Sequence, residues 1–157
     1  MANRLMMIAL VDIDHTLSNA AVRDHLINPN DWDGYHSASR GDVPIIPMRE
    51  LVRALYGANW QVILLTTRPE KWRQLTMIWL ARHEIKFDEL LMRPDDDERS
   101  TDDVKMSLFR ERFPDLTDCM PVLFDDRESV IKTFREAGIT SLHVHAGDIR
   151  NEQPEVR

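Results

Sequence analysis

The sequence contains a single cysteine, Cys119, among 157 residues. An internal disulfide is therefore excluded, and such low cysteine usage fits a reducing compartment. No apolar stretch reaches the ~20 residues that a membrane-spanning helix needs. The apolar run near the N-terminus is short and lacks a small-residue cleavage site, so we expect no signal peptide. Together these absences predict a cytoplasmic protein without a membrane segment.

Acidic residues outnumber basic ones, 27 to 20. The formal net charge is −7, which argues against a broad, non-specific hold on long nucleic acid, where affinity comes from neutralising many phosphates. Binding of one terminal phosphate or of a mononucleotide stays open. The 43% hydrophobic and 30% charged content is ordinary for a globular protein with one core. We predict one domain over residues 1–157, with a frayed polar tail at about 148–157.

Buried strands alternate with helices along the chain. The apolar run Leu5–Val11 has no helical period, which is typical of a strand buried on both faces of a parallel sheet. Further strands are predicted over Gln61–Leu65, Glu89–Met92, Pro121–Phe124 and Leu142–Val144, and helices over Pro47–Gly57, Pro69–His83, from a capping box at Ser100–Asp103 to near Pro114, and up to Gly138. This order predicts an α/β fold with a five-stranded parallel, doubly wound sheet. Residues 18–46 are poorly periodic, and we expect them to form an excursion above the sheet.

Polar side chains of matched chemistry follow three of these strands. In open α/β sheets the ligand crevice lies outside the carboxyl ends of the strands. The residues concerned are Asp12 and Asp14 after the first strand, Thr66, Thr67 and Arg68 after the second, Asp125 and Asp126 after the fourth, and Lys105 on the helix before the fourth. Each alone has an ordinary alternative: a polar turn, a helix N-terminus or a surface lysine. Their combination predicts a site for a metal ion, a nucleophile or both.

In this order, these residues resemble the four motifs of the haloacid dehalogenase (HAD) superfamily of phosphohydrolases. The motifs correspond to the D-x-D-x-T loop Asp12–Thr16, the strand Val62–Thr66, Lys105, and the pair Asp125 and Asp126. Within the superfamily the chain is similar to the phosphatase domain of bacteriophage polynucleotide kinase, through Leu64–Glu70, Asp102–Lys105 and Phe124–Arg127. No G-x-x-x-x-G-K-[ST] kinase loop is present. The resemblance implies a HAD-like Rossmannoid three-layer sandwich with a minimal cap insertion at about 18–46.

The resemblance also implies a Mg²⁺-dependent phosphomonoesterase. Asp12 would attack phosphorus and form an aspartyl-phosphate. Asp14 would protonate the leaving group and later activate water, and we expect this acid role to need a raised pKa. Thr66 and Lys105 would stabilise the transferring phosphoryl group. The implied metal ligands are oxygens, which suit Mg²⁺: the Asp12 carboxylate, the Asp14 backbone carbonyl and Asp125. For Asp126 three roles stay open: direct ligand, ligand through water, or orientation of Lys105.

The substrate side of the site rests on Thr67, Arg68 and His15. His15 and Thr67 stand where the family often has glycine, and Arg68 has the bidentate reach to bind a phosphate. The alternative for Arg68 is a surface arginine at a helix start.

The small insertion predicts an open site, which favours a nucleotide or a nucleic-acid end as substrate. Trp32, Tyr35 and His36 either stack on a base or anchor the excursion to the core. A phosphatase for a sugar or other small metabolite phosphate is the first alternative function, and a non-catalytic phosphate-binding module is the second. An oligomer stays possible.

Overall fold

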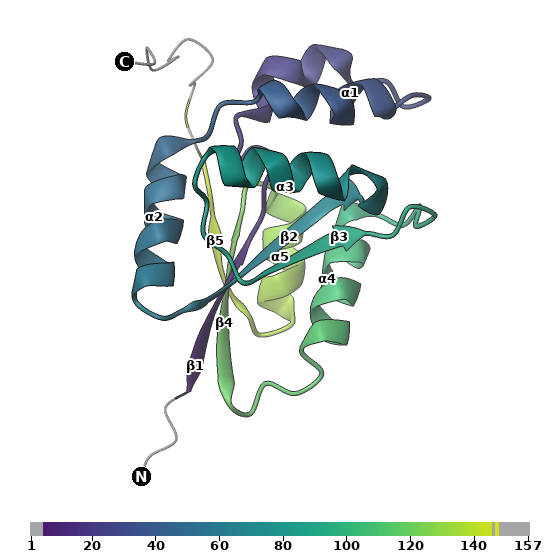
Figure 1. The fold of residues 1–157 in the computed structure, drawn as a ribbon. Coiled ribbons are helices and arrows are strands. Elements are labelled where there is room, and N and C mark those ends of the chain that lie inside the picture. The colour runs from purple at the N-terminus through teal and green to yellow at the C-terminus, as the bar shows by residue number, and fades with distance from the viewer. Residues whose placement is uncertain (1–4, 146, 148–157) are drawn as a thin grey trace.

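The computed structural model describes residues 5–145 and 147. They contain a five-stranded parallel sheet with the strand order β3-β2-β1-β4-β5 (Figure 1). The strands are β1 (Met6–Val11), β2 (Gln61–Pro69), β3 (Glu89–Arg93), β4 (Cys119–Asp125) and β5 (Thr140–His143). The α-helices are α1 (Asp33–Ala38), α2 (Ile46–Gly57), α3 (Arg73–Arg82), α4 (Thr101–Arg112) and α5 (Glu128–Glu136), and the short 3₁₀ helices are η1 (Ala20–Leu26), η2 (Ser39–Gly41) and η3 (Glu70–Trp72). The predicted α/β fold with a five-stranded parallel sheet is confirmed.

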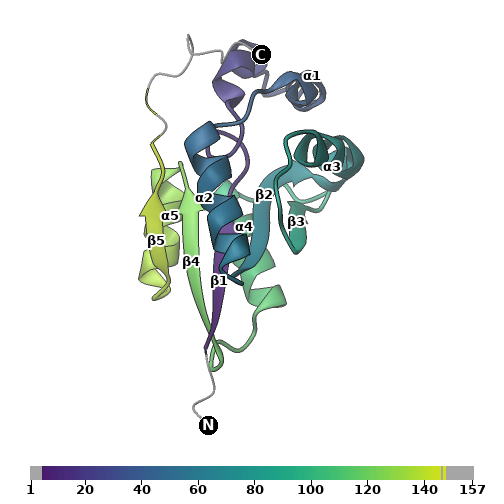
Figure 2. The same ribbon diagram turned by 60° about the vertical axis from the view of Figure 1, so that its left-hand side comes forward.

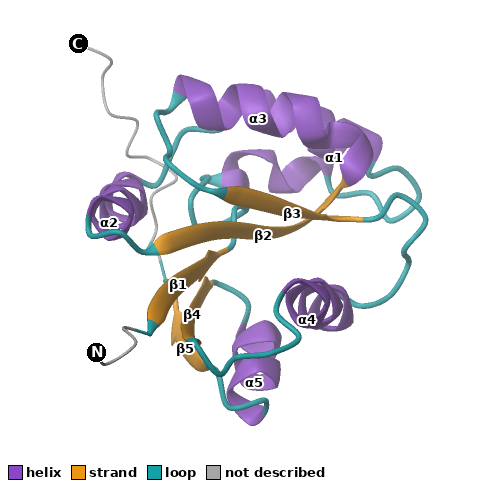
Figure 3. Cartoon of the chain, turned by 60° about the horizontal axis from the view of Figure 1, so that its bottom comes forward, coloured by secondary structure: helices purple, strands orange, loops and turns teal. Residues whose placement is uncertain are grey.

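Helices cover both faces of the sheet and make three layers (Figure 3). Side chains of a strand point alternately to opposite faces. On β1, Ala9 and Val11 therefore belong to the core under α2 and α3, together with Val52 and Trp79. Ile8 and Leu10 belong to the other core, where the apolar faces of α4 and α5 pack. Because both faces of β1 are buried, its sequence is a continuous apolar run.

The strand register decides which residues meet at the carboxyl edge. The last residue of β1, Val11, pairs with Leu64 of β2 and with Phe124 of β4. The Asp12 amide then donates to the Phe124 carbonyl over 3.0 Å. The residues directly after these positions on three neighbouring strands are thus held at one level of the sheet.

Several element boundaries differ from the prediction. β2 continues through Thr66, Thr67 and Arg68 to Pro69, so these residues lie within the strand and not after it. The helix predicted over Pro69–His83 begins as η3 and becomes α-helical only at Arg73. At the start of α4 the Ser100 hydroxyl accepts from the amide of Asp103 over 3.1 Å, as an N-cap does. The predicted tail at 148–157 lies outside the described residues, and no helix of the described part is long and apolar enough to cross a membrane.

The segment between β1 and α2 forms the excursion, residues 18–45. Its two ends are tied together, because the Asn19 amide donates to the Val43 carbonyl over 2.9 Å and the Ile45 amide to the Leu17 carbonyl over 2.7 Å. The excursion contains η1, α1 and η2, and it lies beyond the carboxyl ends of the strands (Figures 1 and 2). It therefore covers the edge at which the predicted site residues meet.

Candidate active site

The loop after β1 presents Asp12 at the carboxyl edge of the sheet. The Ile13 carbonyl accepts from the amides of Thr16, Leu17 and Ser18, so the chain turns tightly at this point. His15 has a φ of 64°, a left-handed conformation that is uncommon for a residue other than glycine. The turn leaves Asp12 almost completely buried, with 5% of its surface exposed.

Lys105 joins carboxylates from two strands. Its Nζ lies 2.6 Å from Asp12 Oδ1 and 2.5 Å from Asp125 Oδ2, and all three side chains are buried. The other Asp12 oxygen, Oδ2, accepts from the Thr16 hydroxyl over 3.1 Å. α4 thus inserts one ammonium group between the ends of β1 and β4, and both oxygens of Asp12 have a partner.

The carboxylates around this lysine carry an excess of negative charge. Oxygens of Asp12, Asp125 and Asp126 lie within 4.8 Å of one another, against the single charge of Lys105. Burial raises the pKa of Asp12 well above its ordinary value; Lys105 opposes this rise, and Asp125 and Asp126 add to it. Burial lowers the pKa of Lys105, but Asp12 and Asp125 outweigh it and raise that pKa. A cluster of oxygen ligands with surplus negative charge fits a hard divalent cation such as Mg²⁺.

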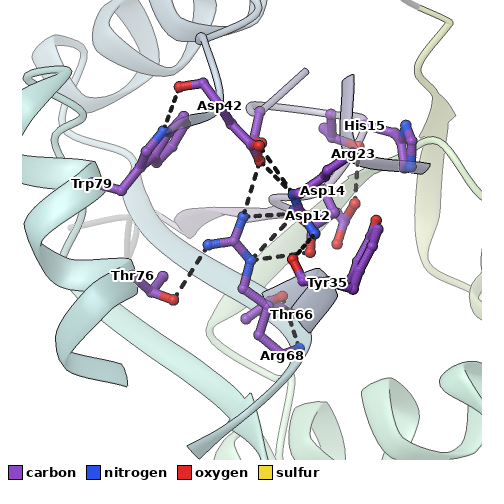
Figure 4. A network of polar contacts seen from close by, with 12 residues as sticks. Asp12, Asp14, His15, Arg23, Tyr35, Asp42, Thr66, Arg68, Thr76 and Trp79 are labelled. Atoms are coloured by element: carbon purple, nitrogen blue, oxygen red, sulfur yellow. Dashed lines mark hydrogen bonds and ion pairs between the residues drawn. The ribbon is translucent and has the colours of Figure 1, made fainter. Parts of the chain in front are cut away.

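Asp14 lies among arginines (Figure 4). Arg68 donates from Nη2 to Asp14 Oδ1 over 2.6 Å and from Nε to Oδ2 over 3.0 Å. Arg23 donates from Nη2 to the same Oδ1. Burial would raise the pKa of Asp14, but Arg68 and then Arg23 outweigh burial and hold this pKa well below its ordinary value. The raised pKa that we expected for an acid role is therefore not present, because guanidinium groups stabilise the carboxylate.

Sequence reasoning missed Arg23 and Asp42, which both come from the excursion. Arg23 is 2% exposed and its Nε lies 3.0 Å from both carboxylate oxygens of Asp42. Asp42 also accepts from the Ser18 hydroxyl, and its carbonyl accepts from Trp79 Nε1 over 2.8 Å. No motif or periodicity marks these residues in the sequence; only the fold places them beside Asp14.

The predicted substrate-side residues occupy different places. Thr66 is buried, and its hydroxyl accepts from the Arg68 amide over 3.2 Å. Thr67 is half-buried, and its carbonyl accepts from Arg93 over 3.2 Å. His15 is half-buried, with Nε2 3.4 Å from an Asp24 oxygen. The surface alternative for Arg68 is wrong, since its side chain is 1% exposed.

Two of three comparisons with known proteins find similar proteins for this chain. The family model described as "Polynucleotide kinase PNKP phosphatase domain" matches residues 6–149. A search of curated proteins gives no match. The solved structure of the Pnkp1/Rnl/Hen1 complex contains a chain with a TM-score of 0.77 and 29% identity, over 92% of this chain and 47% of that chain. A second structure, of the Pnkp1/Rnl/Hen1 RNA repair complex, gives the same score and identity and is covered to 44%. This chain thus spans about half the length of those relatives.

More distant structures share the fold. A predicted phosphatase from Clostridium acetobutylicum has a TM-score of 0.63 and 16% identity, over 94% of this chain and 90% of that chain. A haloacid dehalogenase-like hydrolase from Streptococcus pneumoniae has a TM-score of 0.62 and 14% identity, over 96% and 92%. The expected resemblance is confirmed. Because the family model covers residues 6–149, the chain belongs to the family of polynucleotide kinase PNKP phosphatase domains and is a phosphatase of the HAD superfamily.

Proposed function

We propose that this chain is a Mg²⁺-dependent phosphomonoesterase that forms an aspartyl-phosphate on Asp12 and acts on nucleotide or nucleic-acid-end phosphates. One observation carries the proposal. The Asp12 carboxylate lies at the end of the central strand, 2.6 Å from Lys105 and within 4.8 Å of Asp125 and Asp126 oxygens. A nucleophilic carboxylate needs nearby positive charge before it can approach a phosphate anion, and this cluster holds both a lysine and the ligands for a cation.

In the first step an Asp12 oxygen attacks phosphorus, the bond from phosphorus to the leaving oxygen breaks, and the leaving oxygen takes a proton from Asp14. Lys105, which already contacts Asp12, neutralises charge on the phosphoryl oxygens, and the Thr66 hydroxyl donates a hydrogen bond to them. Asp14 has to carry a proton in this step. We therefore propose that its contacts with Arg68 and Arg23 loosen when substrate binds.

In the second step water attacks the phosphorus of the aspartyl-phosphate, and Asp14 takes a proton from that water. The ionised form of Asp14, which Arg68 and Arg23 stabilise, is the form that a general base needs. Asp12 leaves as a carboxylate and inorganic phosphate is released. The same group thus acts as acid and then as base.

The cation site uses residues of the chain that are already close together. The carboxylates of Asp12, Asp125 and Asp126 and the backbone carbonyl of Asp14 are the proposed ligands. A bound Mg²⁺ supplies positive charge to the phosphoryl oxygens. On the substrate side, Thr67, His15 and Arg68 are the proposed contacts, with Arg68 moving from Asp14 to the phosphate edge of the substrate.

Two findings bear on the substrate. The family is that of polynucleotide kinase phosphatase domains, and one relative at 29% identity is part of an RNA repair complex, which favours a nucleic-acid end. The net charge of −7 favours a small substrate, so a phosphatase for a sugar or other metabolite phosphate is the second candidate. A non-catalytic module loses support, because the family is one of phosphatase domains. We also propose a cytoplasmic location, which the free, buried Cys119 supports.

The test is phosphate release with Mg²⁺ from nucleoside 3′- and 5′-monophosphates, a 3′-phosphorylated oligonucleotide and several sugar phosphates. Asp12→Asn is expected to abolish release, and Asp96→Asn, an exposed aspartate on the loop after β3, to leave it unchanged. Acid quenching of the wild type during turnover should trap phosphate covalently on Asp12. Phosphate release that survives in Asp12→Asn would contradict the role of Asp12 as nucleophile. A preference for sugar phosphates would contradict the proposed substrate class.

A further inference from the structure

Four rings gather beside the candidate active site. This aromatic cluster consists of Trp32, Tyr35 and His36 from the excursion and Trp72 from η3. The Trp32 ring lies 5.7 Å from Tyr35 and 6.2 Å from His36, and the His36 ring lies 6.5 Å from Trp72. Trp32, His36 and Trp72 are tilted by only 35° and 34° in succession. They form a row in which each ring is moderately tilted against the next.

Two ring nitrogens of the cluster lack a partner. His36 Nδ1 and Trp72 Nε1 are buried, and neither has a hydrogen-bond partner within the part of the chain that the structure describes. His36 is 9% exposed. Buried polar atoms of folded proteins are normally paired, by protein, water or ligand. Two unpaired nitrogens on neighbouring rings therefore leave places for a polar partner, either water or a ligand group, within this cluster.

The chemistry of the cluster favours a flat, uncharged partner. Burial lowers the pKa of His36 to about 4; Asp14 opposes this shift, and Arg68 and Arg23 support it. At neutral pH the imidazole is therefore uncharged and offers a hydrogen-bond donor and an acceptor. An indole N–H adds a donor. These groups match the edge of a nucleobase better than a phosphate or the hydroxyl groups of a sugar.

The cluster is connected to the catalytic residues through one arginine. The Arg23 guanidinium carbon lies 4.0 Å from the centre of the Tyr35 ring, and Arg23 donates to the Tyr35 carbonyl over 3.2 Å. The same side chain donates to Asp14. Figure 4 shows Tyr35 beside Arg23, with Asp14 and Asp12 next to them.

Anchoring of the excursion does not account for the whole cluster. The excursion is already held by Arg23 on Asp42, by Trp79 on the Asp42 carbonyl, and by an ion pair of 2.6 Å between Lys71 and Asp33. Trp32 is 46% exposed, so nearly half of this large apolar side chain is presented to solvent. The buried rings of Tyr35 and His36 pack against it. Such an arrangement leaves part of the Trp32 ring free for stacking.

We propose that the aromatic cluster binds the nucleobase next to the scissile phosphate, with the Trp32 indole as stacking surface and His36 Nδ1 and Trp72 Nε1 as hydrogen-bond partners of the base. This inference rests on the proposed function, whose substrate it narrows to a phosphate ester that carries a base. It distinguishes a nucleotide end from an abasic end or a sugar phosphate.

The test compares a nucleotide with its abasic counterpart. Binding of thymidine 3′-monophosphate and of the same sugar phosphate without the base is measured by calorimetry, with Mg²⁺, on the Asp12→Asn background so that no turnover occurs. The ratio of the two dissociation constants reports the base alone. Stacking of a base on an aromatic side chain strengthens binding roughly 5- to 150-fold, so we expect the nucleotide to bind at least about fivefold tighter.

Variants then test whether the ratio of the two dissociation constants depends on the aromatic cluster. Trp32→Ala should bring the ratio close to one, and Trp32→Phe, which keeps a ring, should retain most of it. Tyr56→Ala removes a comparably exposed aromatic (38%) from α2 and should leave the ratio unchanged. Thermal melts of all variants check that the fold is intact.

The outcomes separate this inference from the proposed function. A ratio near one in the parent protein, or an unchanged ratio in folded Trp32→Ala, overturns the base-binding proposal even if phosphate release is robust. A large ratio that depends on Trp32, together with no phosphate release from any nucleotide by the wild type, supports base binding and overturns the proposed function.

Discussion

Removing the ammonium group of Lys105 should destabilise the protein far more than removing the Asp12 carboxylate that it contacts. Lys105 is 2% exposed and bridges Asp12 and Asp125 over 2.6 and 2.5 Å. In Lys105→Met both carboxylates stay buried without their cation, and breaking a buried ion pair by removing one partner costs about 3–5 kcal/mol. For a chain of this size 1 kcal/mol shifts the melting temperature by roughly 2–4 °C. The expected fall is therefore roughly 6–20 °C without divalent metal.

Asp12→Asn should behave differently. The pKa of Asp12 is raised in the folded protein, so its contribution to stability is present below its unfolded pKa of about 4 and is lost as the pH rises through the folded value. At neutral pH the Asp12 carboxyl group therefore opposes folding, and Asp12→Asn should melt at or above the wild-type temperature in EDTA. Mg²⁺ should stabilise the wild type more than Asp12→Asn, since the variant loses a ligand; a ligand at 100 times its Kd adds about 2.7 kcal/mol.

Calorimetric melts at neutral pH, with EDTA and then with Mg²⁺, measure both effects. Lys132→Met is the matched control, because Lys132 is a surface residue of α5 with a side chain that is 76% exposed. A melting temperature of Lys105→Met within about 2 °C of this control would refute the reasoning. Equal destabilisation by Asp12→Asn and Lys105→Met in EDTA would refute it as well.

Three further variants address the surroundings of the site. Asp14→Asn should reduce phosphate release by at least roughly 100-fold, since general acid–base catalysis contributes about 10²–10⁴-fold. With a substrate whose leaving group needs no proton, the variant should lose less of its rate in the first step. Because the folded pKa of Asp14 is lowered, its stabilisation is present above about pH 4 and lost as the pH falls further; acid titration followed by circular dichroism should show a shallower loss in Asp14→Asn. Arg23→Met leaves Asp14 and Asp42 with one fewer cation and should cost about 3–5 kcal/mol in urea unfolding, whereas no change would show that Arg68 alone suffices. Ser100→Ala removes the N-cap of α4 and should cost about 1 kcal/mol with unchanged kcat; a loss of activity would mean that the cap also positions Lys105.

Much of the fold was predictable because it depends on short-range patterns. The continuous apolar run that became β1 indicates a strand buried on both faces, and the alternation of strands and helices indicates a parallel sheet. Boundaries were less accurate. β2 extends to Pro69 and includes Thr66–Arg68, since pairing with β3, which no local pattern reports, continues the strand to Pro69.

The candidate site likewise contains residues that local patterns predicted and residues that they did not. Asp12 and Asp125 were grouped from the sequence because parallel strands end at one edge, and Lys105 because it matches the lysine motif on the helix before β4. The structure brings the three together. The partners of Asp14 were not predictable in this way. Arg23 lies 9 residues and Arg68 54 residues along the chain from Asp14, and Arg23 comes from a segment without periodicity.

The sequence by itself determined the α/β class, the central strand and the identity of the chemical groups, because hydrophobic periodicity and motif spacing are local properties of the chain. The tertiary structure alone decided the electrostatics. The burial of Asp12 and Asp125 around one lysine, the two arginines on Asp14 and the two unpaired ring nitrogens in the aromatic cluster depend on which distant segments pack together. A shifted pKa and an unpaired buried atom both result from the surroundings of a residue, and these surroundings exist only in the folded chain.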